Sequence, residues 1–130
     1  MASRIGSRLI KRILVDTGAD FNILFKNAFD ALGPHDSDLH THQNGEVGIG
    51  DFFIKPNGVV KLPISVGNEV NRRTIMADFV VFKDHTAYNV ILGRKTLNDF
   101  YMVVFTRYLT MKFWADDSTI GTIYGNLERQ

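Results

Sequence analysis

The sequence predicts a mostly β domain in which short strands form a closed or folded sheet, with one or two short helices. Its apolar residues fall mainly in short runs of strand length. Turn-forming residues such as Gly, Pro and Asn separate these runs. The chain has 130 residues, which is the size of one compact domain. We therefore expect a single domain over 1–130, with its core at about 9–125.

The N-terminal third combines two predicted strands with a short helix. Residues 9–15 are apolar and rich in β-branched side chains, and they run into the turn-forming Asp16-Thr17-Gly18. The apolar run resumes after this turn, and Gly33-Pro34 then provides a helix stop signal. The elements expected here are strands at 9–15 and 21–25, one or two helical turns at 26–32 and a polar loop at 35–44.

A hairpin is predicted in the middle of the chain. Its arms are expected at 46–54 and 59–66, where apolar residues recur at strand spacing. Lys55-Pro56-Asn57-Gly58 lies between them. Proline fixes one φ angle and Asn-Gly tolerates positive φ, so these residues suit the turn.

The C-terminal half again consists of short apolar runs. The first is rich in Ile, Val and Phe, and the second ends at Gly93. The elements expected here are strands at 74–82 and 88–92, a short helix at 94–100, a hairpin of 102–106 with 109–114, and a last strand at 119–124.

Composition excludes several classes of protein. The 15 basic and 14 acidic residues nearly balance, which argues against nucleic acid as the main partner. The chain has no cysteine, so disulfides and thiolate zinc sites are excluded. No apolar run approaches the roughly 18 residues that a membrane span needs. We therefore expect neither nucleic acid nor a membrane among its partners.

Two further patterns are weak. The segment 35–44 contains three histidines and two aspartates, but their spacing fits no compact zinc pattern, so a polar surface loop is preferred. Gly45, Gly48 and Gly50 lack the strand-then-helix setting of a dinucleotide fingerprint. We expect no metal and no cofactor. The residues of the first pattern are His35, Asp36, Asp38, His40 and His42.

The strongest chemical signal is Asp16-Thr17-Gly18. Alone it reads as an ordinary turn, in which Asp bonds its own backbone and Gly supplies an unusual dihedral angle. Here Ile13-Leu14-Val15 feeds directly into it, so the carboxylate is expected at the end of a buried strand. A lone ionised carboxylate there would be costly to desolvate. A second carboxylate that shares one proton with it would relieve that cost.

Two later features accompany this turn. In Val90-Ile91-Leu92-Gly93-Arg94, apolar residues precede a glycine whose missing side chain lets another strand pass close beside the turn. Between the two lies a glycine-rich segment, with Gly45, Gly48, Gly50 and Gly58, which could be a mobile cover.

These features, in this order, resemble the retropepsin-like aspartic proteases, and most closely the protease domain of gypsy-type retrotransposon polyproteins, particularly plant ones. The resemblance covers about 9–125. It departs at Trp114, where relatives often have Pro, and at 126–129, which match only loosely. The matching stretches are Ile13 to Ala19, Ile23-Leu24-Phe25, Gly58 to Gly67, Asp78-Phe79-Val80-Val81, Ala87 to Arg94 and Lys112-Phe113.

The resemblance implies an aspartic endopeptidase with Asp16 as its catalytic residue. The chain has one Asp-Thr-Gly, so an active enzyme would be a homodimer with one catalytic Asp16 per chain. The two carboxyl groups would activate a water molecule that attacks the peptide bond of a polypeptide substrate.

Supporting roles follow from the same resemblance. Thr17 would bond across the two-fold axis, and Gly18 and Ala19 would let the substrate backbone approach. Asp20 and Arg94 would pair to fix the loop, unless they form only an exposed ion pair of little energetic value. Gly93 would lie beside the turn. A hairpin at about 46–62, with its tip within 50–58, would be the flap; its residues include Gly48, Ile49, Gly50, Asp51, Phe52 and Phe53.

Polyprotein processing is the implied task, inside the cell, in the cytoplasm or within virus-like particles. Two alternatives stay open. The domain could be a catalytically silent dimerising or peptide-binding module of the same fold. It could also be a retropepsin of the ubiquitin-shuttle type, since the tail after Gly93-Arg94 is longer than in the compact retroviral enzymes and similar in length to that type.

Overall fold

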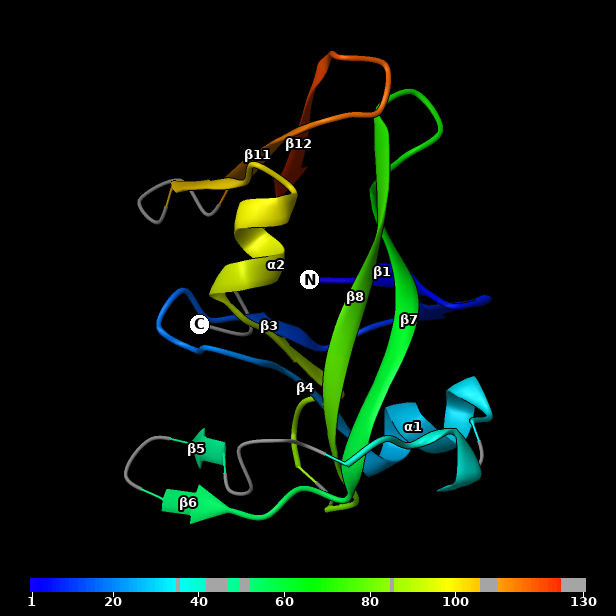
Figure 1. The fold of residues 1–130 in the computed structure, drawn as a ribbon. Coiled ribbons are helices and arrows are strands. Elements are labelled where there is room, and N and C mark those ends of the chain that lie inside the picture. The colour runs from blue at the N-terminus through cyan, green and yellow to red at the C-terminus, as the bar shows by residue number, and fades with distance from the viewer. Residues whose placement is uncertain (35, 42–46, 50–51, 85, 106–109, 125–130) are drawn as a thin grey trace.

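The computed structural model describes residues 1–34, 36–41, 47–49, 52–84, 86–105 and 110–124 (Figure 1). Strands dominate this part, and it contains two short α-helices, α1 (Lys26–Leu32) and α2 (Arg94–Asp99), and one 3₁₀ turn, η1 (Asp36–Asp38). The mostly β fold class with short helices is confirmed. No helix among the described residues is both long enough and apolar enough to cross a membrane.

The main sheet has seven strands in the order β2-β1-β7-β8-β4-β9-β3 and curls toward a closed barrel. The long hairpin β7–β8 runs through the molecule, and the short strands lie across and beside it (Figure 1). The strands are β1 (Ser3–Ile5), β2 (Arg8–Ile10), β3 (Ile13–Val15), β4 (Asn22–Phe25), β7 (Gly58–Gly67), β8 (Arg72–Phe82) and β9 (Val90–Leu92).

Two smaller sheets complete the described part. β5 (Val47–Ile49) pairs antiparallel with β6 (Phe52–Ile54). β10 (Val103–Phe105), β11 (Thr110–Trp114) and β12 (Ile120–Tyr124) form an antiparallel meander. The hairpin expected from 102–106 and 109–114 is therefore present as β10–β11, and the last expected strand as β12.

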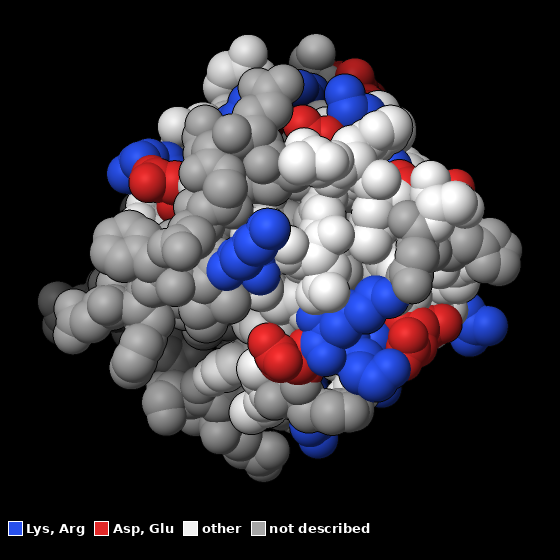
Figure 2. All heavy atoms as spheres, turned by 60° about the horizontal axis from the view of Figure 1, so that its bottom comes forward, with Lys and Arg blue, Asp and Glu red and all other residues white. Residues whose placement is uncertain are grey.

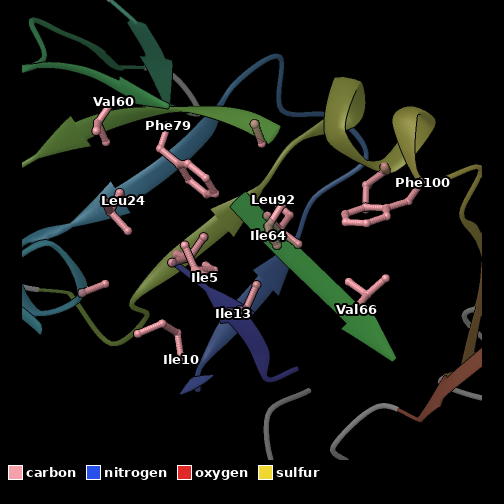
Figure 3. Close-up of a cluster of buried hydrophobic side chains, with 14 of the residues drawn as sticks. Ile5, Ile10, Ile13, Leu24, Val60, Ile64, Val66, Phe79, Leu92 and Phe100 are labelled. Atoms are coloured by element: carbon pink, nitrogen blue, oxygen red, sulfur yellow. The ribbon is translucent and has the colours of Figure 1, made fainter. Parts of the chain in front are cut away.

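The larger of two buried apolar clusters in the described part of the chain fills the space enclosed by the main sheet. Ile5, Ile64 and Leu92 point toward one another from β1, β7 and β9, and each is fully buried (Figure 3). Phe79 and Phe100 are also fully buried in this core. Full burial of one such side chain contributes about 1.5–3 kcal/mol. The core therefore fixes how β9 lies against the rest of the sheet.

The helix expected at 26–32 is present as α1 with those bounds. It ends at Gly33, whose φ of 81° lies in the left-handed region, and the N–H of Gly33 donates to the carbonyl of Phe29 at 3.2 Å. Glycine adopts this conformation without steric cost, which explains the stop signal in the sequence.

The single strand expected at 9–15 is wrong, because the chain changes partners in its middle. β2 pairs with β1, whereas β3 pairs in parallel with β9. Arg12, between them, has a positive φ of 59°. Asn89 holds this bend: its Nδ2 donates to the Lys11 carbonyl at 2.7 Å, and its N–H donates to the Arg12 carbonyl at 3.0 Å.

Arg12→Gly is expected to leave stability unchanged or raise it by up to about 1 kcal/mol, because a left-handed non-glycine residue costs about 1–2 kcal/mol and part of that gain is lost to backbone entropy. Arg8→Gly in β2 is the matched control, and it should lower stability by about 0.5–1 kcal/mol. Urea unfolding followed by circular dichroism measures both. Equal losses in the two variants would contradict strain at Arg12.

The hairpin expected from 46–54 and 59–66 is also wrong. β5 and β6 pair with each other, and β7 pairs along its whole length with β8. The first expected arm thus folds back on itself, and the second pairs with the strand that follows it. Gly67, with φ 94°, and Asn68, whose Oδ1 accepts the N–H groups of Val70 and Asn71, make the β7–β8 turn.

Candidate active site

The Asp16 turn follows β3 directly. The N–H of Asp16 donates to the carbonyl of Leu92 at 3.0 Å, which continues the parallel β3–β9 pairing by one residue. Oδ1 of Asp16 accepts the N–H of Gly18 at 2.9 Å, and the carbonyl of Asp16 accepts the N–H of Ala19 at 3.2 Å. The turn therefore closes on its own carboxylate, which points one oxygen into the loop.

The expectation of a buried carboxylate is wrong for the single chain. Asp16 is exposed, as are Thr17 and Gly18. β3 has three residues, and of these only Ile13 is buried, so the strand reaches the surface before the turn begins. In one chain, desolvation therefore imposes no large cost on Asp16.

A sharp corner between β9 and α2 supports this turn. Three consecutive residues of the corner bond to the segment 16–22: the Leu92 carbonyl accepts from Asp16, the Gly93 N–H donates to Asn22 Oδ1 at 2.8 Å, and the Arg94 N–H donates to the Ala19 carbonyl at 2.8 Å. The Asp16 turn and the start of β4 are thus joined to the corner by three hydrogen bonds in a row.

Gly93 is the point of closest approach in this corner. A Cβ atom there would lie 2.6 Å from the Phe21 carbonyl oxygen and 2.9 Å from the Ala19 carbonyl oxygen. Both are backbone atoms, which cannot rotate away. The position therefore accepts only glycine without a shift of the loop, and this is the close passage beside the turn that a residue without a side chain permits.

Asp20 and Arg94 form the expected ion pair at the end of the loop. Their side chains are 65% and 57% exposed, respectively. An ion pair this exposed contributes about 1 kcal/mol or less. In the single chain, the backbone bond from Arg94 to Ala19 is the firmer connection between these two segments.

Asn22 was not singled out from the sequence. It is the first residue of β4 and only 6% of it is exposed. Its carboxamide bonds to β8, to Gly93 in the β9–α2 corner and to α2. The available signal was an amide side chain at the start of the apolar run Ile23-Leu24-Phe25. A polar group that is carried into a core must find hydrogen-bond partners there.

The segment expected to be the flap is described in part. The backbone of Gly48, Ile49, Phe52 and Phe53 lies in the β5–β6 hairpin, whereas Gly50 and Asp51 lie outside the described residues. In Figure 1 this hairpin lies on the same side of β7–β8 as the loop that follows β3. A cover over the Asp16 turn is compatible with this position.

A cavity of about 700 Å³ adjoins the candidate site. One wall is the loop from Asp20 to Asn22, and the floor is the outer face of the β7–β8 hairpin, where Lys61 lies opposite Asp78. Its volume falls in the range of small-ligand sites, about 300–1,000 Å³. The remaining lining residues are His40, Thr41, Val59, Met76, Ala77, Val80, Lys95, Thr96 and Asp99.

Charge on the face shown in Figure 2 is mixed. In Figure 2, groups of basic and acidic side chains lie beside each other around an uncharged strip. Among the described residues, no group of three or more His, Asp or Glu side chains could hold a metal ion. His35 and His42, from the histidine-containing segment 35–44, lie outside the part that the structure describes.

Solved structures that share this fold include two retroviral protease-like proteins. The retroviral protease-like domain of Ddi1 from Leishmania major matches with a TM-score of 0.63 and 18% identity, over 94% of this chain and 87% of that one. The EIAV protease in complex with the inhibitor HBY-793 matches with a TM-score of 0.54 and 20% identity, over 76% and 84%. No family model matches the chain, and no curated protein does. The chain has a retropepsin-like fold.

Proposed function

We propose that this protein is an aspartic endopeptidase that is active as a homodimer. One observation carries the proposal: in a retropepsin-like fold, the Asp16-Thr17-Gly18 turn follows β3 and is bonded to the β9–α2 corner at Asp16 and Ala19. The exposure of Asp16 in one chain suits a carboxylate that meets a second copy of itself.

Two Asp16 side chains provide complementary proton transfers. The ionised carboxylate takes a proton from water as the water oxygen attacks the peptide carbonyl carbon. The protonated carboxyl gives its proton to the carbonyl oxygen, which produces a tetrahedral diol. One carboxyl group then gives a proton to the nitrogen and the C–N bond breaks, while the other takes a proton from a hydroxyl of the diol. The amine and the carboxylic acid are released, and the pair again holds one proton. One carboxyl group cannot be base and acid at the same moment, so the second chain is needed.

A polypeptide is the substrate class that this arrangement supports. The cavity beside Asp20 offers apolar and charged contacts next to the turn, as an extended peptide with mixed side chains would require. We assign Thr17 to the contact between chains, and Gly18 and Ala19 to the approach of the substrate backbone.

The direct test is cleavage of an unfolded, reduced and carboxymethylated protein by the purified chain at mildly acidic pH, beside Asp16→Asn. Light scattering reports the oligomeric state in the same buffer. Cleavage by wild type alone supports the proposal. Cleavage that persists in Asp16→Asn, or that a metal chelator removes, would rule it out.

The β5–β6 hairpin is proposed to be the flap. Gly48→Val should lower turnover several-fold with little loss of stability, because a β-branched residue restricts a backbone that must open and close. Lys112→Val, at an exposed position of β11, is the control and should leave both unchanged. Initial rates at substrate concentrations well below saturation decide the matter, and wild-type rates in Gly48→Val would contradict gating by this hairpin.

The biological task is proposed to be processing of a polyprotein in the cytoplasm or in virus-like particles. A retropepsin of the ubiquitin-shuttle type is the second candidate. It is favoured by one observation, that the Ddi1 domain covers 94% of this chain and the EIAV enzyme 76%. Assays on the natural flanking sequences and on ubiquitin-tagged proteins would separate the two.

A further inference from the structure

The carboxamide of Asn22 uses all of its hydrogens at a junction of four elements. Its Oδ1 accepts the N–H of Gly93 at 2.8 Å. Its Nδ2 donates to the carbonyl of Asp78 at 3.0 Å and to the hydroxyl of Thr96. The side chain is 94% buried within the described structure, so water cannot replace these partners without rearrangement.

The hydrogen bonds of Asn22 affect the Asp16 turn because the two residues that flank Gly93 are bonded to that turn. Leu92 accepts the N–H of Asp16 through its carbonyl, and Arg94 donates its N–H to the carbonyl of Ala19. Both ends of the catalytic turn are therefore tied to the residues that flank Gly93. A shift of Gly93 away from Asn22 would move both ties.

We propose that Asn22 is a positioning residue for Asp16: it fixes the β9–α2 corner, and the corner holds the turn. Asn22 itself touches no reacting atom. The catalytic consequence rests on the proposed protease function, whereas the structural link between Asn22 and the turn does not.

The chemistry of the site favours an amide over other side chains. The Asp78 carbonyl needs a donor and the Gly93 N–H needs an acceptor, and a carboxamide supplies both. Leucine has a similar shape but supplies neither, so it leaves the buried Gly93 N–H without its partner. Aspartate keeps the acceptor for Gly93 and replaces the donor by a charge that faces the Asp78 carbonyl oxygen.

The structural test is amide hydrogen exchange of the full chain by NMR. In Asn22→Leu, exchange at Asp16 and Arg94 should rise at least about tenfold relative to core amides such as that of Phe79, which corresponds to loss of one buried hydrogen bond. Ser3→Ala is the matched control. Ser3 is also buried and its hydroxyl donates to the Ser65 carbonyl, far from the turn in sequence. It should not raise exchange at Asp16 and Arg94 beyond the core.

Two further variants keep the test decisive. Asn22→Ala removes the same groups with less steric demand, and it serves if Asn22→Leu does not fold. Asn22→Asp retains an acceptor for Gly93, so it should restore part of the protection that the leucine variant loses. Exchange at Asp16 and Arg94 that stays at the wild-type ratio in both Asn22→Leu and Asn22→Ala would overturn the proposal.

The kinetic test separates positioning from binding. Asn22→Leu should lower kcat by between about tenfold and about a hundredfold, the effect of misplacing a reacting group by a fraction of an ångström to one ångström, with KM within about twofold of wild type. Ser3→Ala should change neither constant. Faster exchange with an unchanged kcat would overturn the catalytic role. If wild type cleaves nothing, the proposed function fails, and the exchange experiment still decides whether Asn22 holds the turn.

Discussion

Asp16→Asn is expected to lower proteolytic activity by at least about a thousandfold, since both proton transfers are lost and each such transfer contributes about 10²–10⁴-fold. The fold should survive, because the asparagine side chain can still accept the Gly18 N–H that Asp16 Oδ1 now accepts. Stability should be unchanged or higher, because in the proposed dimer the two Asp16 carboxylates would no longer repel each other. Initial cleavage rates and thermal unfolding of the same preparations measure both effects.

A mixing experiment shows whether the site is shared. Equal amounts of wild type and Asp16→Asn are unfolded together and refolded. With random pairing, about one quarter of the dimers carry two Asp16 side chains, so about one quarter of the activity should remain. Independent subunits would retain about one half. Activity that falls linearly with the wild-type fraction, once native mass measurement has confirmed subunit exchange, would exclude a site that two chains build together.

Gly93→Ala is expected to have the second largest effect, with a loss of about 3 kcal/mol or more in the free energy of unfolding and with loss of activity. The added Cβ would lie 2.6 Å from one backbone oxygen and 2.9 Å from another, so the loop or the corner must move. The φ of Gly93 is −94°, which alanine adopts freely, and the cost is therefore steric and not conformational.

Gly18→Ala is the control for stability. A Cβ there would meet only Oδ1 of Asp16, at an ordinary contact distance of 3.4 Å. Its unfolding free energy should change by less than about 1 kcal/mol. Urea unfolding gives the free energy of unfolding of both variants. It thus compares Gly93, which backbone atoms crowd, with Gly18, which they do not. If Gly93→Ala and Gly18→Ala had the same free energy of unfolding, the β9–α2 corner would be able to move at little energetic cost, which contradicts the prediction.

Local signals predicted much of the fold. The helix at 26–32 was correct because its stop signal is Gly33, which needs no partner elsewhere in the chain to act. The strands at 74–82 and 119–124 were found because their residues favour extended backbone. Which strands pair with each other could not be predicted from local signals in the same way. β7 has a neighbour in sequence on each side, the 46–54 segment and β8, and turn-forming residues lie between β7 and each of them. It pairs with β8, and the local turn signals alone do not rank the two choices.

For the candidate site, too, the local motif could be predicted from the sequence and the long-range contacts could not. Asp16, Thr17 and Gly18 were predicted from a local motif. The role of Asn22 was not predicted, because its partners Asp78, Gly93 and Thr96 are distant in sequence and no short sequence pattern indicates these contacts. The burial of Asp16 was misjudged for a related reason. An apolar run predicts a buried strand, but it does not predict where along the strand the protein surface begins.

The bonds that hold the Asp16 turn have a consequence for the order of folding. Asn22 and Gly93 are 71 residues apart, and β3 pairs with β9 across a similar separation. Contacts of such long range form slowly, since a large loop must close first. A ribosome-bound chain that ends before β9 therefore has the Asp-Thr-Gly sequence but no partner strand to shape it. The Asp16 turn therefore takes its final shape only after most of the domain has been made. If the proposed protease function holds, a nascent chain that ends before β9 is inactive.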